Sequence, residues 1–96
     1  MGVALVASHP VHGRRRLTLE DAANVGSDPS SDLRLEAPAD AHHARFLFRD
    51  NRLIVVDLRS LLGTYINGRR IMQATIVRPG DELKIELAED LRMPTM

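Results

Sequence analysis

Short runs of alternating apolar and polar residues extend along almost the whole chain. Strand character is clear in residues 3–8, 15–19, 23–25 and 33–35, and segments rich in glycine, proline, serine and aspartate separate these runs. An alternation with period two is typical of strands that bury one face, and the intervening residues are turn formers. The first third of the chain therefore predicts several short strands and no helix.

The clearest pair of strands lies in the middle of the chain, in the sequence ARFLFRDNRLIVVDL at residues 44–58. Phe46 and Phe48 alternate with neighbours of the opposite face, and a second run rich in β-branched residues follows Asp50 and Asn51. Aromatic and β-branched residues favour strands, and a two-residue polar connection favours a tight hairpin. This segment predicts a β-hairpin.

Further strand runs follow at residues 64–66, 74–77 and 82–87, with an Asn67-Gly68 turn after the first of them. Asparagine and glycine tolerate the positive φ angles that a type I′ turn requires. Residues 87–93 can be interpreted as a short helix or as a last edge strand, because an isolated helix of that length is unstable. Strands spaced this regularly predict an all-β sandwich.

Composition and charge narrow the class of protein. At 96 residues the chain is expected to form a single domain over residues 1–96, and 44% hydrophobic and 27% charged residues are typical of a folded protein. Thirteen basic residues balance thirteen acidic ones, so we expect no nucleic-acid partner and no membrane contact. The absence of cysteine and of any export or membrane-spanning segment leads us to expect a cytoplasmic domain.

Three ordered blocks of sequence carry a resemblance to a known family. VGSDPSSDLRL at residues 25–35, DAHHARF at 40–46 and DLRSLLGTYING at 57–68, followed by VRPGDELKI at 77–85, resemble the forkhead-associated (FHA) domain. That resemblance implies a β-sandwich of two antiparallel sheets with about eleven short strands. The FHA family reads phosphothreonine peptides, so the resemblance also implies where such a peptide site would lie in this chain.

Many positions match the FHA pattern, and each has a structural reason. The glycines suit tight turns or close backbone approach, the Asn-Gly pair sets a hairpin register, and the family's histidine braces loops without touching phosphate. The residues that we assign to this structural group are Gly26, His43, Gly63, Thr64, Asn67, Gly68, Gly80 and Asp81.

The departures from the pattern fall on the ligand side. Ser27 and Asp40 stand where the resemblance places the phosphate-binding arginine and serine, and Leu61 and Leu62 stand where it places peptide-binding residues. Two lost hydrogen bonds to a charged group remove roughly 3 to 6 kcal/mol of binding free energy. A carboxylate at Asp40 also repels phosphate, so the resemblance implies a degenerate phosphopeptide site.

We therefore predict a protein-interaction module that binds an unphosphorylated protein partner, or a second copy of itself, through this loop end. The predicted contact residues are Ser27, Asp40, Ala41, Arg59, Ser60, Leu61 and Leu62. Three alternatives stay open: the two leucines belong to the core, Arg59 and Ser60 support weak phosphothreonine binding in bacterial Ser/Thr kinase signalling, or the domain is a purely architectural part of a larger regulatory or secretion-ring protein.

Other candidate chemistry is weak. His42 and His43 are adjacent and would point to opposite faces of a strand, and His9 and His12 have no carboxylate or cysteine at ligand spacing, so no metal site is predicted. No nucleophile or phosphate-cradling motif is present, so we expect neither an enzyme nor a cofactor. The arginines at 14–16 and 69–70 favour solvated strand edges over a phosphate-binding patch.

Overall fold

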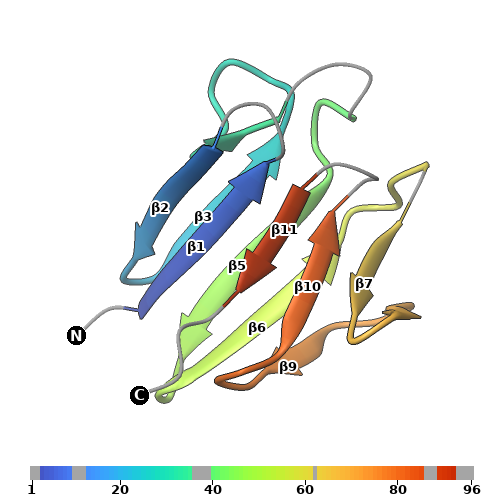
Figure 1. The fold of residues 1–96 in the computed structure, drawn as a ribbon. Coiled ribbons are helices and arrows are strands. Elements are labelled where there is room, and N and C mark those ends of the chain that lie inside the picture. Colours follow the sequence, from blue (N-terminus) through green and yellow to red (C-terminus); the bar gives the residue numbers. More distant parts are fainter. Residues whose placement is uncertain (1–2, 10–12, 36–39, 62, 86–88, 93–96) are drawn as a thin grey trace.

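The fold is a sandwich of strands without a helix in the described part of the chain (Figure 1). The computed structural model describes residues 3–9, 13–35, 40–61, 63–85 and 89–92. Its strands are β1 (Val3–His9), β2 (Gly13–Leu19), β3 (Ala22–Gly26), β4 (Leu33–Arg34), β5 (Ala44–Arg49), β6 (Arg52–Asp57), β7 (Thr64–Ile66), β8 (Arg69–Arg70), β9 (Thr75–Val77), β10 (Glu82–Ile85) and β11 (Glu89–Arg92). The predicted all-β architecture is confirmed.

The strands form two layers. One sheet has six strands in the order β2-β1-β11-β10-β7-β8, and the other has five in the order β4-β3-β5-β6-β9. Every pairing is antiparallel except that of β3 with β4, which is parallel over two residues. The side chain of Asp32, just before β4, accepts a hydrogen bond from the Asn24 amide of β3 at 2.7 Å. This bond holds the start of β4 beside β3, and the two strands run in the same direction.

The core lies between the two sheets. Phe46 and Val55 of the five-stranded sheet, and Leu5, Leu83 and Ile85 of the six-stranded sheet, are completely buried. They occupy alternate positions of their strands, so the period-two pattern in the sequence corresponds to one buried face in each sheet. Burial of apolar surface on these two faces is the main source of stability.

Two tight hairpins have the geometry that the sequence predicts. Asp50 and Asn51 have φ angles of 51° and 61°, and they connect β5 to β6 where Arg49 pairs with Arg52. Asn67 and Gly68 connect β7 to β8 with φ angles of 50° and 84°. Positive φ at both central residues is the signature of a type I′ turn.

The open choice for residues 87–93 is decided in favour of a strand. Within that segment, residues 89–92 form β11, which pairs with β1 on one side and β10 on the other. Among the described residues, no helix is long and apolar enough to cross a membrane.

Candidate functional site

Three loops meet at one end of the sandwich: residues 27–32 after β3, residues 40–43 before β5, and residues 58–63 between β6 and β7. The Ser27 amide donates to the Asp40 carbonyl at 2.8 Å, which ties the first loop to the second. Gly26 stands at this junction, where a Cβ atom would lie 2.0 Å from the carbonyl oxygen of Ala41. Close approach of two backbone segments therefore requires glycine there.

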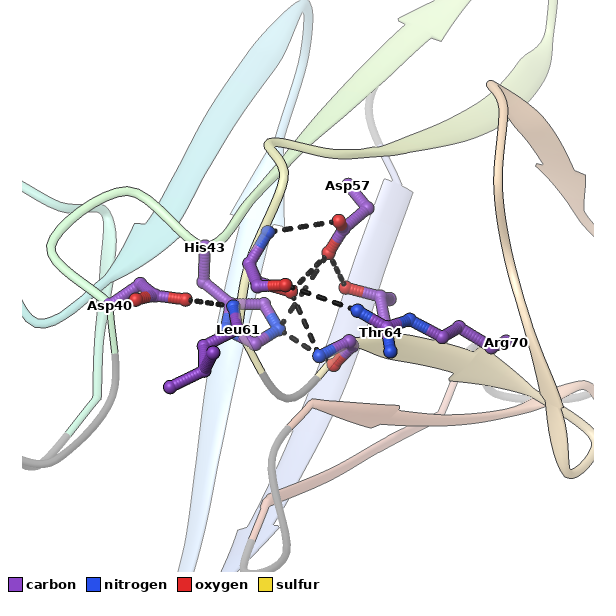
Figure 2. A network of polar contacts seen from close by, with 8 residues as sticks. Asp40, His43, Asp57, Leu61, Thr64 and Arg70 are labelled. Atoms are coloured by element: carbon purple, nitrogen blue, oxygen red, sulfur yellow. Dashed lines mark hydrogen bonds and ion pairs between the residues drawn. The ribbon is translucent and has the colours of Figure 1, made fainter.

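The loop after β6 is folded around the carboxylate of Asp57, as Figure 2 shows. Asp57 accepts hydrogen bonds from the Ser60 hydroxyl at 2.5 Å, the Ser60 amide at 3.0 Å and the Thr64 hydroxyl at 2.7 Å. The Ser60 oxygen in turn accepts from the Gly63 amide at 3.0 Å. These bonds satisfy the polar groups of the loop and fix its shape.

Protonation of Asp57 is coupled to the same network. Partial burial raises the pKa of the Asp57 carboxyl, but the hydrogen bonds from Ser60 and Thr64 and the nearby His43 ring outweigh it. The net pKa of Asp57 lies below its ordinary value of 3.8. The carboxylate form is the one that the loop stabilises.

His43 connects two of the loops from inside the molecule. Its side chain is completely buried, and its Nε2 donates a hydrogen bond to the Gly63 carbonyl at 2.9 Å. The same nitrogen lies 4.0 Å from the Asp57 carboxylate. This geometry fits the loop-bracing role that the resemblance implies for His43.

Arg70 on β8 is a further residue of the site that sequence reasoning missed. Its guanidinium donates to the Ser60 carbonyl at 3.2 Å and covers Gly63, where an added Cβ would lie 2.7 Å from the Arg70 Nε. The only sequence signal is a basic pair directly after the Asn-Gly turn. Nothing in that pair distinguishes Arg70 from the neighbouring Arg69.

The outer surface of the same loop has a different character. Leu61 is 81% exposed, which agrees with the interpretation that it faces solvent. Its amide donates a hydrogen bond to the Asp40 carboxylate at 2.7 Å, so the side chain of the second loop holds the backbone of the third (Figure 2). Arg59 and Ala41 are also exposed beside it.

The remaining predicted contact residues are placed differently. Ser60 is only 5% exposed, and its hydroxyl belongs to the Asp57 network, so it does not lie on the outer surface that was predicted for it. Ser27 is half-buried next to the second loop. Leu62 and residues 36–39 lie outside the described residues.

A second polar cluster lies at the far end of β7 and connects β7 to β10. Asn67 donates to the Asp81 carboxylate at 3.1 Å and accepts from the Glu82 amide at 3.0 Å. Asp81 also accepts from the Arg78 amide at 2.8 Å, which closes the turn around Gly80 with its φ of 91°. These contacts hold β7 to β10.

No metal-ligating cluster is found in the described residues, where no three side chains of histidine, aspartate or glutamate gather suitably. His42 is exposed and His43 is buried, so the two adjacent rings do not share a surface. His9 and His12 cannot be placed, because their side chains lie outside the described part.

Comparisons with known proteins agree with one another. The family model for the FHA domain matches residues 23–86. The oxoglutarate dehydrogenase inhibitor of Corynebacterium glutamicum is 34% identical over 82 residues, which cover 84% of this chain and 57% of the relative. The glycogen accumulation regulator GarA of Mycobacterium tuberculosis is also 34% identical over 82 residues, with 84% and 50% coverage. The chain thus spans about half the length of these relatives.

Solved structures show the same fold. The FHA domain of CT664 from Chlamydia trachomatis superposes with a TM-score of 0.85 at 20% identity, covering 100% of this chain and 99% of that one. Mycobacterium tuberculosis EmbR, solved in complex with a low affinity phosphopeptide, gives a TM-score of 0.81 at 24% identity over 98% of this chain and 25% of EmbR.

Proposed function

This chain belongs to the FHA domain family, and we propose that it is a non-catalytic protein-interaction module that binds its partner through the loop end without needing phosphothreonine. The contact surface is formed by Leu61 with Asp40, Ala41 and Arg59. Ser27 lies at its edge, and Ser60 supports it from inside.

The contact between Asp40 and Leu61 carries this proposal. The FHA resemblance puts Asp40 where a serine would bind phosphate and Leu61 where a residue would hold the peptide. Instead, the Asp40 carboxylate accepts the Leu61 amide at 2.7 Å, so an acidic group of the chain itself uses that donor. A phosphate charge about 4 Å from a carboxylate is repelled by roughly 1 kcal/mol in water and about 4 kcal/mol near a protein surface.

The exposed side chains favour an apolar contact. Leu61 presents most of its surface to solvent at the tip of a loop whose backbone is fixed from below. Exposed apolar groups with a polar rim are typical of protein interfaces, and Arg59 and Asp40 provide such a rim. A rigid loop also loses little conformational entropy on binding.

The names of the relatives support a regulatory role. One is an inhibitor of oxoglutarate dehydrogenase and the other a regulator of glycogen accumulation. A non-catalytic domain that acts by binding another protein fits both names. Because this chain spans only part of each relative, we infer the kind of partner from the chemistry of its own surface and not from those names.

Phosphothreonine binding is the second candidate, and two observations favour it. EmbR, a structural neighbour, was solved with a phosphopeptide. Arg59 is an exposed residue of the loop between β6 and β7 and could provide a displaced cation.

A titration against paired peptide libraries separates the two candidates. The purified chain is titrated with a degenerate phosphothreonine library and with its unphosphorylated counterpart, and fluorescence anisotropy reports binding. We expect no preference for phosphate in the wild type. Micromolar binding that depends on phosphate and is abolished by Arg59→Ala would overturn the proposal.

A gain-of-function variant makes the test sharper. Ser27→Arg combined with Asp40→Ser restores the two residues that the FHA pattern places at the phosphate. We expect phosphate-dependent affinity to rise roughly a hundredfold or more, which corresponds to two hydrogen bonds to a charged group. Thr18→Arg, on the exposed face of β2, controls for the introduced arginine. A double variant that behaves like this control would contradict the assignment of the site.

A further inference from the structure

The outward face of the five-stranded sheet carries a continuous apolar row. Strand register aligns Ala22 of β3 with Leu47 of β5, Leu47 with Ile54 of β6, and Ile54 with Ile76 of β9. Their sequence neighbours point into the core, so these four side chains point away from it. The sandwich has two layers, and no described element covers this face.

Such a row is unusual on a solvated sheet. Antiparallel sheets with one free face normally place polar residues outward. Here Ile76 is 44% exposed, and Leu47 and Ile54 are half-buried. Val56, also half-buried, extends the row along β6. Strand propensity explains each β-branched residue singly, but it does not require four apolar residues in one line. A contiguous apolar surface is the mark of a contact site.

The charged side chains that point outward from these four strands are all arginines, although the exposed Asp21 directly precedes Ala22. Among the outward residues of β3, β5, β6 and β9, the charged ones are Arg45, Arg49 and Arg52. Arg45 flanks the row on one side, opposite Val56, and the Arg49–Arg52 pair flanks it on the other. Arg49 makes an exposed ion pair with Asp21 at 3.4 Å, whereas no described residue forms an ion pair with Arg45 or Arg52. The outward charge of these four strands is therefore positive, although the whole chain has no net charge.

We propose that this face docks an amphipathic helix of a partner protein, with an apolar stripe over the row and acidic residues against the arginines. Three strand spacings separate Ala22 from Ile76, or roughly 14 Å. A helix covers that distance in about ten residues, so apolar positions i, i+3, i+7 and i+10 would follow the row. Glutamates or aspartates beside that stripe would complement the flanking arginines.

A second copy of this chain fits the face less well. A twofold interface places the same patch against itself, and arginines would then meet arginines. Like charges directly opposite one another are unfavourable. The charge of the face therefore selects an acidic partner and disfavours self-association.

A designed peptide pair tests the docking surface. One peptide of about 20 residues carries leucines at helical spacing and flanking glutamates, and the matched peptide has lysine in place of glutamate. Each is titrated into the ¹⁵N-labelled chain, and amide chemical shifts report the contact. We expect saturable shifts of amides on β5, β6 and β9 with the acidic peptide. The basic peptide should bind about threefold to tenfold more weakly.

Surface variants show whether the contact is the one proposed. Ile76→Glu and Arg52→Glu should each reduce binding of the acidic peptide, while Thr18→Glu on the other sheet and Leu61→Asp at the loop end should not. Dispersed spectra confirm that each variant is folded. Equal binding of both peptides, no saturable shift on this sheet, or shifts confined to the loop end would overturn the proposal.

Discussion

Ser60 and Leu61 are adjacent in the chain and belong to opposite halves of one loop. Ser60 is 5% exposed and joins the Asp57 network, whereas Leu61 is 81% exposed and faces solvent. The inner half matches the FHA pattern, and the outer half departs from it. Different residues therefore set the shape of the loop and the chemistry that it presents.

This division has an energetic counterpart. Hydrogen bonds to a carboxylate stabilise by about 1.5 to 3 kcal/mol each, and Asp57 accepts three of them. Substitutions at exposed positions usually change stability by less than about 0.5 kcal/mol. Variants of the inner half should therefore lose stability, and variants of the outer half should lose binding alone.

Gly26→Ala is the variant expected to lose the most stability, because it disrupts the junction between the loops that follow β3 and precede β5. An added Cβ would lie 2.0 Å from the Ala41 carbonyl oxygen, which is a backbone atom and cannot easily move away. We expect a loss of about 3 kcal/mol or more in urea denaturation, or no folding. Gly68→Ala is the control, because nothing lies within 4 Å of its Cβ and only its positive φ costs about 1 to 2 kcal/mol. Equal losses for both variants would contradict the role of close approach.

Asp57→Ala should have the next largest effect on stability. It removes the acceptor for the Ser60 and Thr64 groups, and we expect a loss of about 2 to 4 kcal/mol, less than the sum of three separate bonds. Asp21→Ala, whose carboxylate is exposed, should change stability by under about 0.5 kcal/mol. A near-neutral Asp57→Ala would mean that the network does not hold the loop.

The pH dependence of stability should report the same carboxylate. Because the pKa of Asp57 is lowered in the folded protein, its contribution is present above the ordinary pKa near 4 and is lost as pH falls through the folded pKa. We expect the wild type to lose stability between about pH 5 and pH 2, and Asp57→Asn to lose less. Asp28, whose pKa is lowered by its hydrogen bonds from Ser30, should leave a residual slope in the variant. Parallel curves for both proteins would exclude Asp57 as a major contributor.

Leu61→Asp tests the outer half directly. Loss of one buried leucine from an interface costs about 1.5 to 3 kcal/mol, so binding should weaken roughly tenfold to a hundredfold. The measurement uses unphosphorylated peptides selected by phage display on the wild-type chain. The free energy of unfolding should change by less than about 0.5 kcal/mol. A variant that unfolds would instead show that Leu61 contributes to the core.

Arg70→Ala should have the smallest effect and should sharpen the boundary between the two halves. It removes the hydrogen bond to the Ser60 carbonyl and the cover over Gly63, with an expected cost of about 0.5 to 1 kcal/mol. Arg69→Ala, an exposed neighbour on the same short strand, is the matched control. If both variants behave alike, Arg70 has no specific role in holding the loop.

Much of the fold could be predicted from local patterns. The central hairpin, the Asn67-Gly68 turn and the strand at 64–66 all follow from residues within a few positions of one another. The parallel pairing of β4 could not be predicted, because it depends on a hydrogen bond between Asn24 and Asp32 across an irregular loop. Local sequence signals determine strands and tight turns, but they do not determine which strand a segment pairs with after a long irregular loop.

The site was less predictable than the fold for a related reason. Exposure of Leu61 is favoured by its place just ahead of Gly63, with a core position left open, whereas burial of Ser60 depends on where the Asp57 carboxylate points. The contact between Asp40 and Leu61 joins residues 21 positions apart. Arg70 reaches back over ten positions to the same loop. Such contacts arise only once the three-dimensional arrangement of the loops is known.

The place of β11 in the six-stranded sheet bears on how this protein is made. The β1–β2 hairpin joins the rest of its sheet through β11 alone, because β11 lies between β1 and β10. A ribosome makes β1 first and β11 last, so the sheet cannot close until the nascent chain has emerged almost to Arg92. During synthesis the edge of β1 that faces away from β2 stays unpaired until β11 has been made. Pairing of β1 with β11 joins residues far apart in the sequence, and such long-range pairing is slow. Chaperone dependence during translation should therefore centre on β1 and β2 and end once β11 has emerged and paired with β1.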